Sequence, residues 1–543
     1  MKYGVFSANE WMYPDGDPTK GKRSIRVISA RGGVAAAQIL CSAKRVTWKW
    51  SEGEGQGLCE PQVNRLISIY VDRNTAPVDT TMVIPQGTVV DYVTRLAPFD
   101  VFDAMEPMEA GTAEAAEGQM LGLYLRWPIG DMAAGVYRGT LTLTGDDGQT
   151  AEIAVEITVA NVRIPEKKTL KITNWYHVLN MATYHGVEPW SDAHWALIEQ
   201  YGKRMCELRQ THFWIYPSLA QVKLEENGTY TFDFSRIERL IRLYLSLGME
   251  YIEGAPLFTR DGWSNVEFQV KIADESVPLS SDKGMMYAEA FHTQWYAFLV
   301  KNGWYDIHLQ HVCDEPAAHC AENYREAASL VRKWMPGVKI MEATELPDLD
   351  GCLDVWVPKS LDYSKRREIY EAKRGSTAKE LWYYTCCFPG GKFLNRMLDM
   401  ELIRTRYLHW ANLLYDLKGY LHWGLNMYQH SPGGVWTGAC HPQKGQGGIA
   451  PVEASAQDNI NNDTLPAGDT HILYPMGQKI LTSVRFEMMR AGCEDYELLA
   501  LLKKKDAKAA EEILSSCVRS FTDYTVELDV FDKAYARLLG ALE

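Results

Sequence analysis

Two adjacent carboxylates, Asp314 and Glu315, close an apolar stretch over residues 305–315 and precede Pro316. A charged pair at the end of an apolar strand costs desolvation energy unless it is paired or used. Pro316 is expected to hold Glu315 in an extended conformation and to delay the start of a helix. Neighbouring residues of a strand face opposite sides, but where the strand ends both can reach one open face. Two such carboxylates could divide the chemistry, one transferring a proton and the other stabilising a cation. The alternative is a salt-bridged pair with only a structural, capping role.

The elements that must position this pair are strand-like runs that alternate with helical stretches after residue 165. Two of the helical stretches are 191–209, which opens on a Ser-Asp start, and 234–247, which has apolar residues at three- and four-residue spacing. The alternation predicts a (β/α)8 TIM-like barrel, whose catalytic face is formed where the strands end. The eight strand-like runs are 170–177, 211–217, 250–257, 305–315, 338–344, 353–358, 380–385 and 419–426.

One short link makes the predicted barrel irregular, and two long inserts interrupt it. About eight residues join the fifth and sixth strands, too few for a helix. Long inserts over 258–281 and 429–470 follow the third and eighth strands. Because loops that follow barrel strands build the active face, we expect both inserts to border the site.

Residues 1–165 have a different pattern, with short alternating runs separated by turn residues. The segment GDDG at 145–148 lies between two such runs, as in a hairpin of an antiparallel sheet. We therefore expect a multidomain protein of α and β elements: an N-terminal antiparallel β-sandwich over 1–165, a catalytic barrel over 166–505, and a C-terminal helical segment over 506–543 packed on the barrel.

Composition excludes several classes of function. The 56 Lys and Arg against 70 Asp and Glu give a net charge of −14, which disfavours a nucleic-acid partner. No apolar run is long enough to enter a membrane as a helix. The 17 Trp and 29 Tyr suit a carbohydrate partner, because the C–H faces of sugars pack on aromatic rings. The 11 Cys include no CxxC pair, and free thiols with no apolar leader predict a cytoplasmic location.

Three histidines, His308, His311 and His319, surround the carboxylate pair and raise the alternative of a metal site. His308 and His311 lie on opposite faces of the strand, whereas a zinc site needs three or four convergent ligands. The glycine-rich segment 444–448 lacks the strand and helix that flank a phosphate-binding loop. We therefore predict no metal and no other cofactor.

The carboxylates available at the strand ends constrain the chemistry. Conventional hydrolysis of a glycosidic bond uses two carboxylates, about 5–5.5 Å apart for retention and about 6.5–9.5 Å for inversion. Many barrel enzymes place the acid after strand four and the nucleophile after strand seven, but strand seven here ends at Thr385-Cys386. A 2-acetamido sugar can supply its own amide oxygen as nucleophile, so that one carboxylate acts as acid and base while its neighbour orients the amide. Glu253 or Glu342 could instead be a conventional second carboxylate, which would allow other sugars.

A resemblance to a known family rests on several stretches in order along nearly the whole chain. The chain resembles glycoside hydrolase family 123 and the related barrel family called DUF4091. The stretches that carry the resemblance are Leu123-Tyr124-Leu125-Arg126, Gly135-Val136-Tyr137-Arg138-Gly139-Thr140, Asp314-Glu315-Pro316, Leu381-Trp382-Tyr383-Tyr384-Thr385-Cys386 with Arg406 and Trp410, Gly468-Asp469 through Tyr474-Pro475, Ser483-Val484-Arg485-Phe486-Glu487 and Glu494-Asp495-Tyr496-Glu497.

The resemblance implies a function and a set of residue roles. Characterised members of the family are β-N-acetylgalactosaminidases, so the implied partner is a glycan or glycoconjugate with a 2-acetamido sugar. Asp314 would orient the acetamido group, Glu315 would protonate the leaving oxygen and then activate water, and Tyr384 would hydrogen-bond the acetamide. Their positions at strand ends add further candidate substrate contacts: Trp423, Asn426, Trp175, His177 and Tyr216.

Two further expectations can be compared with the structure. Arg485, Glu487 and Asp495 are predicted to form a buried ion network rather than to bind substrate. A non-catalytic glycan-binding protein with a decayed site is an alternative to an enzyme, although the retained pair Asp314-Glu315 argues against decay.

Overall fold

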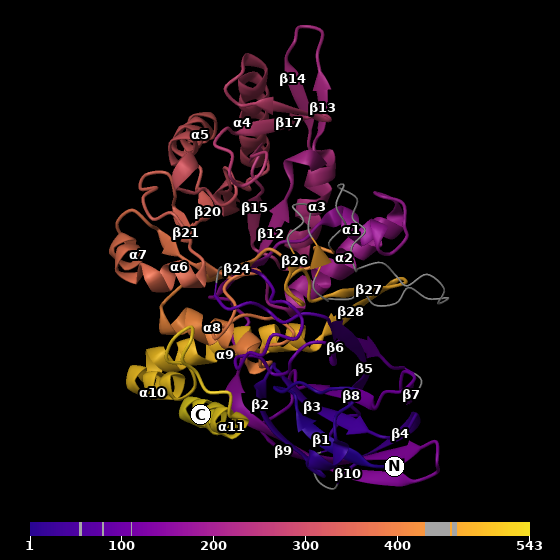
Figure 1. Ribbon diagram of the computed structural model, residues 1–543. Coiled ribbons are helices and arrows are strands. Elements are labelled where there is room, and N and C mark those ends of the chain that lie inside the picture. Colours follow the sequence, from indigo (N-terminus) through magenta and orange to yellow (C-terminus); the bar gives the residue numbers. More distant parts are fainter. Residues whose placement is uncertain (54–56, 79–80, 110, 429–456, 459–463) are drawn as a thin grey trace.

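Two β-sheets form the amino-terminal part of the structure, a computed structural model that describes residues 1–53, 57–78, 81–109, 111–428, 457–458 and 464–543. In Figure 1 these sheets lie at the bottom, below a part built from short parallel strands and helices. This organisation confirms the predicted multidomain protein of α and β elements.

The first sheet has seven strands. All its described pairings are antiparallel. Its strands are, in spatial order, β1 (Tyr3–Ser7), β3 (Val34–Cys41), β8 (Leu121–Pro128), β5 (Gln62–Val71), β6 (Phe99–Pro107), β28 (Lys479–Ser483) and β27 (Tyr474–Met476).

The second sheet has five strands. It is antiparallel except for the parallel pair β2 and β10. Its strands are, in spatial order, β2 (Ile25–Arg31), β10 (Thr150–Arg163), β9 (Gly135–Gly145), β4 (Arg45–Glu52) and β7 (Thr112–Glu114).

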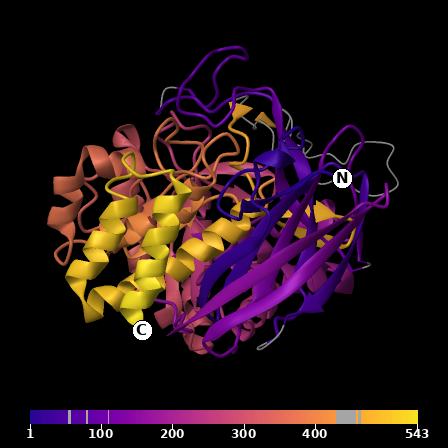
Figure 2. The same ribbon diagram turned by 90° about the horizontal axis from the view of Figure 1, so that it is seen from below.

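The two sheets pack face to face, as the alternating sequence pattern predicts. Every second residue along the first part of β10 is buried, because successive side chains of a strand point to opposite faces. Ile153 and Ile157 of β10 share one core with Ile39 of β3 and Trp127 of β8. Figure 2, seen from below, shows this layered part beside the carboxy-terminal helices.

Two strands of the seven-stranded sheet come from far along the chain. Strand β28 pairs with β6 through Thr482 opposite Met105 and Ser483 opposite Ala104. A sandwich confined to residues 1–165 does not contain this addition. The chain returns from the parallel-stranded part, completes the sheet, and then begins α9 (Val484–Lys505), whose N-terminus is capped by the Ser483 hydroxyl.

Short parallel strands form the second part, at the eight positions that the sequence predicts. They make three three-stranded sheets rather than one continuous eight-stranded ladder, because each strand keeps only two to four residues. The sheets are β11 (Lys171–Asn174) with β24 (Gly419–His422) and β23 (Tyr383–Tyr384); β12 (His212–Ile215) with β15 (Tyr251–Gly254) and β19 (His308–Gln310); and β20 (Met341–Ala343) with β21 (Val355–Val357) and β22 (Glu380–Leu381).

Isolated contacts join neighbouring sheets. The Thr211 amide donates to the Ile172 carbonyl (3.0 Å), between β11 and β12. A parallel bridge joins Gln310 to Ile340, between β19 and β20. Only Trp382 separates β22 from β23 along the chain. These contacts keep the carboxyl ends of the strands on one face.

Helices flank the parallel strands, and the helix predicted over 191–209 is confirmed as α2, capped by the Ser191 hydroxyl. No described helix lies between β20 and β21, as their short link predicts. None of the described helices has the length and apolar character needed to span a bilayer. The helices are α1 (Val178–Thr183), α2 (Asp192–Glu207), α3 (Ser235–Ser246), α4 (Asp282–Lys301), α5 (Ala321–Trp334), α6 (Ser360–Lys365), α7 (Arg367–Lys373), α8 (Ile403–Leu414), α9, α10 (Ala507–Cys517) and α11 (Leu528–Leu542).

Buried ion pairs fasten the two parts together and confirm the predicted network. Arg485 of α9 donates from Nη2 to Asp103 of β6 at 2.8 Å, and neither side chain is exposed. Arg406 of α8 and Asp495 of α9 form two hydrogen bonds of 2.7 and 2.8 Å. Glu487 is fully buried between cations, 3.0 Å from Arg490. These charges therefore hold the fold together.

The inserts add small sheets at the ends of strands. The insert after β15 contains β16 (Phe258–Thr259), β17 (Gln269–Ile272) and β18 (Glu275–Pro278). The loop after β12 contains the hairpin β13 (Gln221–Leu224) and β14 (Tyr230–Asp233). Most of the predicted insert 429–470, including segment 444–448, lies outside the described residues, which contain from it β25 (Gln457–Asp458) and β26 (Thr464–Leu465).

Candidate active site

Asp314 and Glu315 lie just beyond β19, on the face where the parallel strands end. Glu315 has φ of 45°, so the extended conformation predicted from Pro316 is wrong. The proline rule disfavours the right-handed helical region for the preceding residue, and here the chain takes the left-handed one. A positive φ outside glycine costs free energy and persists only where other contacts hold it.

Arg260 holds this turn. Its Nη2 atom donates to the carbonyl oxygens of Asp314 (2.8 Å) and Glu315 (3.0 Å). Arg260 follows β16, at the start of the insert after β15. One guanidinium from a neighbouring loop thus fixes the peptide units on both sides of the strained residue through their backbone carbonyls.

Tyr384, the last residue of β23, donates a hydrogen bond from its hydroxyl to Oε1 of Glu315. Burial and the charge of Glu315 raise the pKa of Tyr384 well above its ordinary value, so the phenol remains a donor. The ammonium of Lys359, after β21, lies 5.6 Å from the centre of the Tyr384 ring. Glu315 therefore has a neutral donor in contact and a cation nearby.

The carboxyl group of Asp314 is incompletely hydrogen-bonded. Its Oδ1 atom is buried and has no hydrogen-bond partner among the described residues. Burial, followed by the charges of Glu315 and Glu342, raises the pKa of Asp314 to about 8, against the lowering effect of His311 and Arg260. Burial and the neighbouring charges therefore disfavour the ionised form of the Asp314 carboxyl.

A fully buried charge cluster lies beneath the pair. His311 Nδ1 is 2.8 Å from Oε1 of Glu342, and His311 Nε2 is 3.0 Å from Oε1 of Glu253. All three side chains have no exposed surface. Burial disfavours the imidazolium, but the two carboxylates outweigh that effect and raise the pKa of His311 to about 10. His311 is therefore a cation between two anions.

The other polar contacts of Glu253 and Glu342 complete their environment. Glu253 accepts from the indole N–H of Trp175 (2.8 Å) and from the hydroxyl of Thr173. Oε2 of Glu342 accepts from the Val312 amide (2.9 Å) and from the hydroxyl of Tyr324 (3.0 Å). Because both side chains are unexposed and hydrogen-bonded, the arrangement disfavours either of them as a second reactive carboxylate.

Tyr216 lies near Asp314, and two further candidates, His177 and Trp175, belong to the same aromatic cluster as Tyr216. The rings of His177 and Tyr216 are 5.4 Å apart and partly exposed. Burial raises the pKa of Tyr216, and the Asp314 charge adds to this increase. Burial lowers the pKa of His177 to about 4, so that ring is neutral. Trp175 is only 7% exposed and stacks on Trp214 at 4.1 Å.

The end of β24 carries the last two candidates. Trp423 is partly exposed, and its indole N–H donates to Oδ2 of Asp469 at 3.1 Å. Asn426 needs a correction, because it is fully buried and both its polar atoms contact the backbone of His177: Oδ1 accepts from the amide at 2.8 Å, and Nδ2 donates to the carbonyl at 3.3 Å. It positions His177 and is not carried forward as a substrate ligand.

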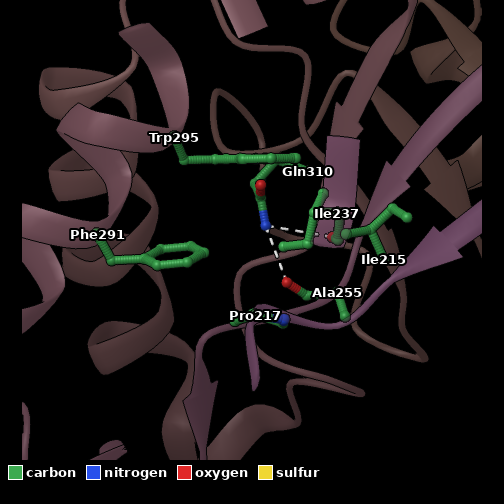
Figure 3. A pocket seen from close by; sticks show the side chains of 8 residues that line it. Ile215, Pro217, Ile237, Ala255, Phe291, Trp295 and Gln310 are labelled. Carbon is green, nitrogen blue, oxygen red and sulfur yellow. Dashed lines mark hydrogen bonds between the residues drawn. The ribbon is translucent and has the colours of Figure 1, made fainter. Parts of the chain in front are cut away.

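Figure 3 shows a small cavity that does not belong to this site. Its lining is mostly apolar, and the amide of Gln310 donates to the carbonyls of Gly254 (3.2 Å) and Ala255 (3.1 Å). It lies between the ends of β12, β15 and β19 and the helices α3 and α4, and we interpret it as a packing gap. The residues that line it are Ile215, Pro217, Ile237, Gly254, Ala255, Phe291, Trp295 and Gln310. The described residues contain no group of three or more His, Cys, Asp or Glu arranged to hold a metal ion.

Sequence reasoning missed Arg260 and Lys359. Lys359 follows the sixth predicted strand by one residue, so the strand-end rule contained the signal. Arg260 lies in an insert, and its hydrogen bonds to two backbone carbonyls leave no pattern in the sequence.

The site has features of a glycoside hydrolase. Two adjacent carboxyls lie where parallel strands end, a tyrosine is hydrogen-bonded to one of them, and aromatic rings lie nearby. Residues 175–502 match the family model described as glycoside hydrolase 123, catalytic domain. The chain therefore belongs to glycoside hydrolase family 123.

One solved structure supports the fold. A family 123 glycoside hydrolase from Clostridium perfringens, analysed for glycolipid glycan hydrolysis, aligns over 99% of this chain and 97% of its own, with 13% identity and a TM-score of 0.73. A family 39 glycoside hydrolase from Bacteroides cellulosilyticus WH2 aligns over 87% and 82% of the two chains, with 10% identity and a TM-score of 0.35. No curated protein matches the chain.

Proposed function

We propose that this enzyme releases terminal β-linked N-acetylgalactosamine from glycans with retention of configuration, using the substrate's own acetamido group as nucleophile. The observation that carries the proposal is the difference in burial and contacts among the nearby carboxylates. Glu253 and Glu342 are fully buried against His311, so Asp314 and Glu315 are the carboxyls left for a bound sugar among the described residues near the end of β19. One pair of adjacent carboxyls suits substrate assistance, which needs no enzymic nucleophile.

In the first step, the bond from the anomeric carbon to the leaving oxygen breaks. The carbonyl oxygen of the acetamido group forms a bond to that carbon, and Glu315 gives its proton to the leaving oxygen. Oδ1 of Asp314, which has no hydrogen-bond partner among the described residues, accepts the acetamido N–H. The positive charge of the oxazolinium ring favours the ionised form of Asp314, which in turn stabilises that charge.

In the second step, water attacks the anomeric carbon and reopens the ring. Glu315 takes the proton of the water and returns to its starting state. Tyr384 donates to Glu315 in the empty site and can turn its hydroxyl to the acetamido oxygen when a sugar binds. Two inversions at one carbon give net retention.

Trp423, His177, Tyr216 and Trp175 are the side chains we propose to border the terminal sugar. The N–H of Trp423 is held by Asp469, which fixes the indole plane for stacking. We also propose that the three parallel sheets act as one (β/α)8 barrel, with the catalytic unit over 166–505. Support for the galacto configuration comes from family membership, and the glycolipid glycan activity of the Clostridium perfringens enzyme makes glycolipid glycans reasonable substrates to try.

Nitrophenol release from three aryl β-glycosides tests the proposal: the N-acetylgalactosaminide, the N-acetylglucosaminide and the plain galactoside. We expect turnover of the first and none of the last, which has no amide to attack. Proton NMR should show the β anomer of the free sugar first. Turnover of the plain galactoside at a comparable rate would mean that the enzyme supplies a nucleophile, and the substrate-assisted mechanism would be rejected.

A further inference from the structure

Trp263 is unusually exposed for a tryptophan of this chain. Its side chain is 53% exposed, whereas the other described tryptophans are buried or partly buried. It lies between β16 and β17, in the insert that follows β15. Tryptophan is enriched among the residues that dominate binding interfaces, and this one lies in an insert that follows a parallel strand, where binding loops are found.

The position of Trp263 is fixed by three contacts. The guanidinium carbon of Arg260 lies 5.3 Å from the centre of its ring. Nη1 of Arg260 donates to the Trp263 carbonyl at 3.2 Å, and Nε2 of His319 contacts the same oxygen at 2.9 Å. A side chain that is held on the backbone side while its ring remains in water is preorganised for a ligand.

The same arginine joins this tryptophan to the catalytic turn. Nη2 of Arg260 donates to the carbonyls of Asp314 and Glu315. Nη1 donates to the Trp263 carbonyl, and the guanidinium group lies over the Trp263 ring. The indole is thus tied to the residue that must protonate the leaving oxygen. Arg260 covers one face of the ring, so the exposed surface belongs to the other face and the rim.

We propose that Trp263 is the platform for the sugar ring on the leaving side of the scissile bond. This assignment rests on the proposed function. The terminal sugar is bordered by side chains from the ends of β11, β12, β23 and β24, whereas Trp263 comes from an insert outside them. The ring it can meet is the next one, whose C–H face stacks on an aromatic face while its hydroxyls stay in water.

The test compares two substrates that share the terminal sugar. One is the methyl β-glycoside of N-acetylgalactosamine, and the other is a disaccharide in which the same residue is linked to galactose. For Trp263→Ala we expect kcat/KM on the disaccharide to fall about tenfold, equal to ~1.4 kcal/mol. The methyl glycoside has no second ring to stack, so its kcat/KM should stay nearly unchanged. Trp263→Phe should recover most of the loss.

Val266→Ala is the matched control, because Val266 lies in the same insert and is 48% exposed. It should leave both substrates unaffected, and thermal unfolding should show that all variants are folded. Equal losses on the two substrates, or no loss on the disaccharide, would overturn the platform. If the wild-type enzyme cleaves neither compound, the proposed function itself fails and the platform fails with it.

Discussion

Replacing Glu315 by Gln removes the proposed acid with little change of shape. Glutamine keeps an oxygen that can accept the hydrogen bond from Tyr384, and the Arg260 contact is to the backbone of residue 315 and is unaffected. The variant therefore isolates the proton. General acid–base catalysis contributes about 10²–10⁴-fold, which is ~3–5 kcal/mol of barrier.

That loss should depend on the leaving group. A methyl or sugar leaving group departs as a poor alkoxide unless it is protonated, so we expect kcat/KM of Glu315→Gln to fall by about 10²–10⁴. A dinitrophenolate departs without a proton, and its loss of activity should be well below this.

The assay is kcat/KM across a series of aryl glycosides whose phenols differ in pKa. The variant should give a steeper dependence on phenol pKa than the wild type. Glu345→Gln is the matched control, because Glu345 is an exposed carboxylate just after β20, and it should follow the wild-type line. A uniform loss across the series would refute the assignment of Glu315 as the acid.

Three further substitutions probe the surroundings. Asp314→Asn should slow every 2-acetamido substrate by about 10²-fold or more. Because the folded pKa of Asp314, about 8, exceeds that of an unfolded Asp, this carboxyl costs stability as pH rises, so thermal unfolding should show the variant to be more stable than wild type by at most about 5 kcal/mol at pH 8 and by less at pH 5. His311, with a folded pKa of about 10, stabilises the fold fully below pH 6.5 and loses that contribution as pH rises through 10; denaturant titrations should show this fall, at most about 5 kcal/mol, in wild type and not in His311→Gln. Asp103→Asn leaves Arg485 buried without its carboxylate and should lower the free energy of unfolding by about 3–5 kcal/mol in the same titrations. A loss below about 1 kcal/mol would contradict a fully buried ion pair.

The order of elements could be predicted from the sequence, because periodicity reports burial locally. The alternating run in β10 and the capping serine of α2 each contain their own signal. Pairing between distant segments has no such signal. Strand β28 reads as a short apolar run, and nothing near it shows that it will complete the sheet that contains β6.

The site was predictable as far as strand ends fix positions. Asp314 and Glu315 were predicted from the end of their strand and Tyr384 from the family resemblance, and the structure brings Glu315 and Tyr384 into contact. Asn426 was misassigned because a strand-end position does not show which way an amide bonds, and here it bonds the backbone of His177. Backbone strain at Glu315 was also missed, since the rule for residues before proline excludes one region of conformation and leaves others open.

The sequence offered four carboxylates for the chemistry, and their partners separate them into two kinds. Glu253 and Glu342 share a cation, His311, and are closed to solvent. Removing that cation would leave uncompensated buried charge, so the intact cluster stabilises the fold at the end of β19. Among the described residues, Asp314 has a carboxyl oxygen without a hydrogen-bond partner, and Glu315 accepts a hydrogen bond from the neutral Tyr384 hydroxyl. The two carboxyls that we propose as reactive are therefore those with the fewest polar contacts, and they lie side by side above a buried cluster whose charges compensate one another.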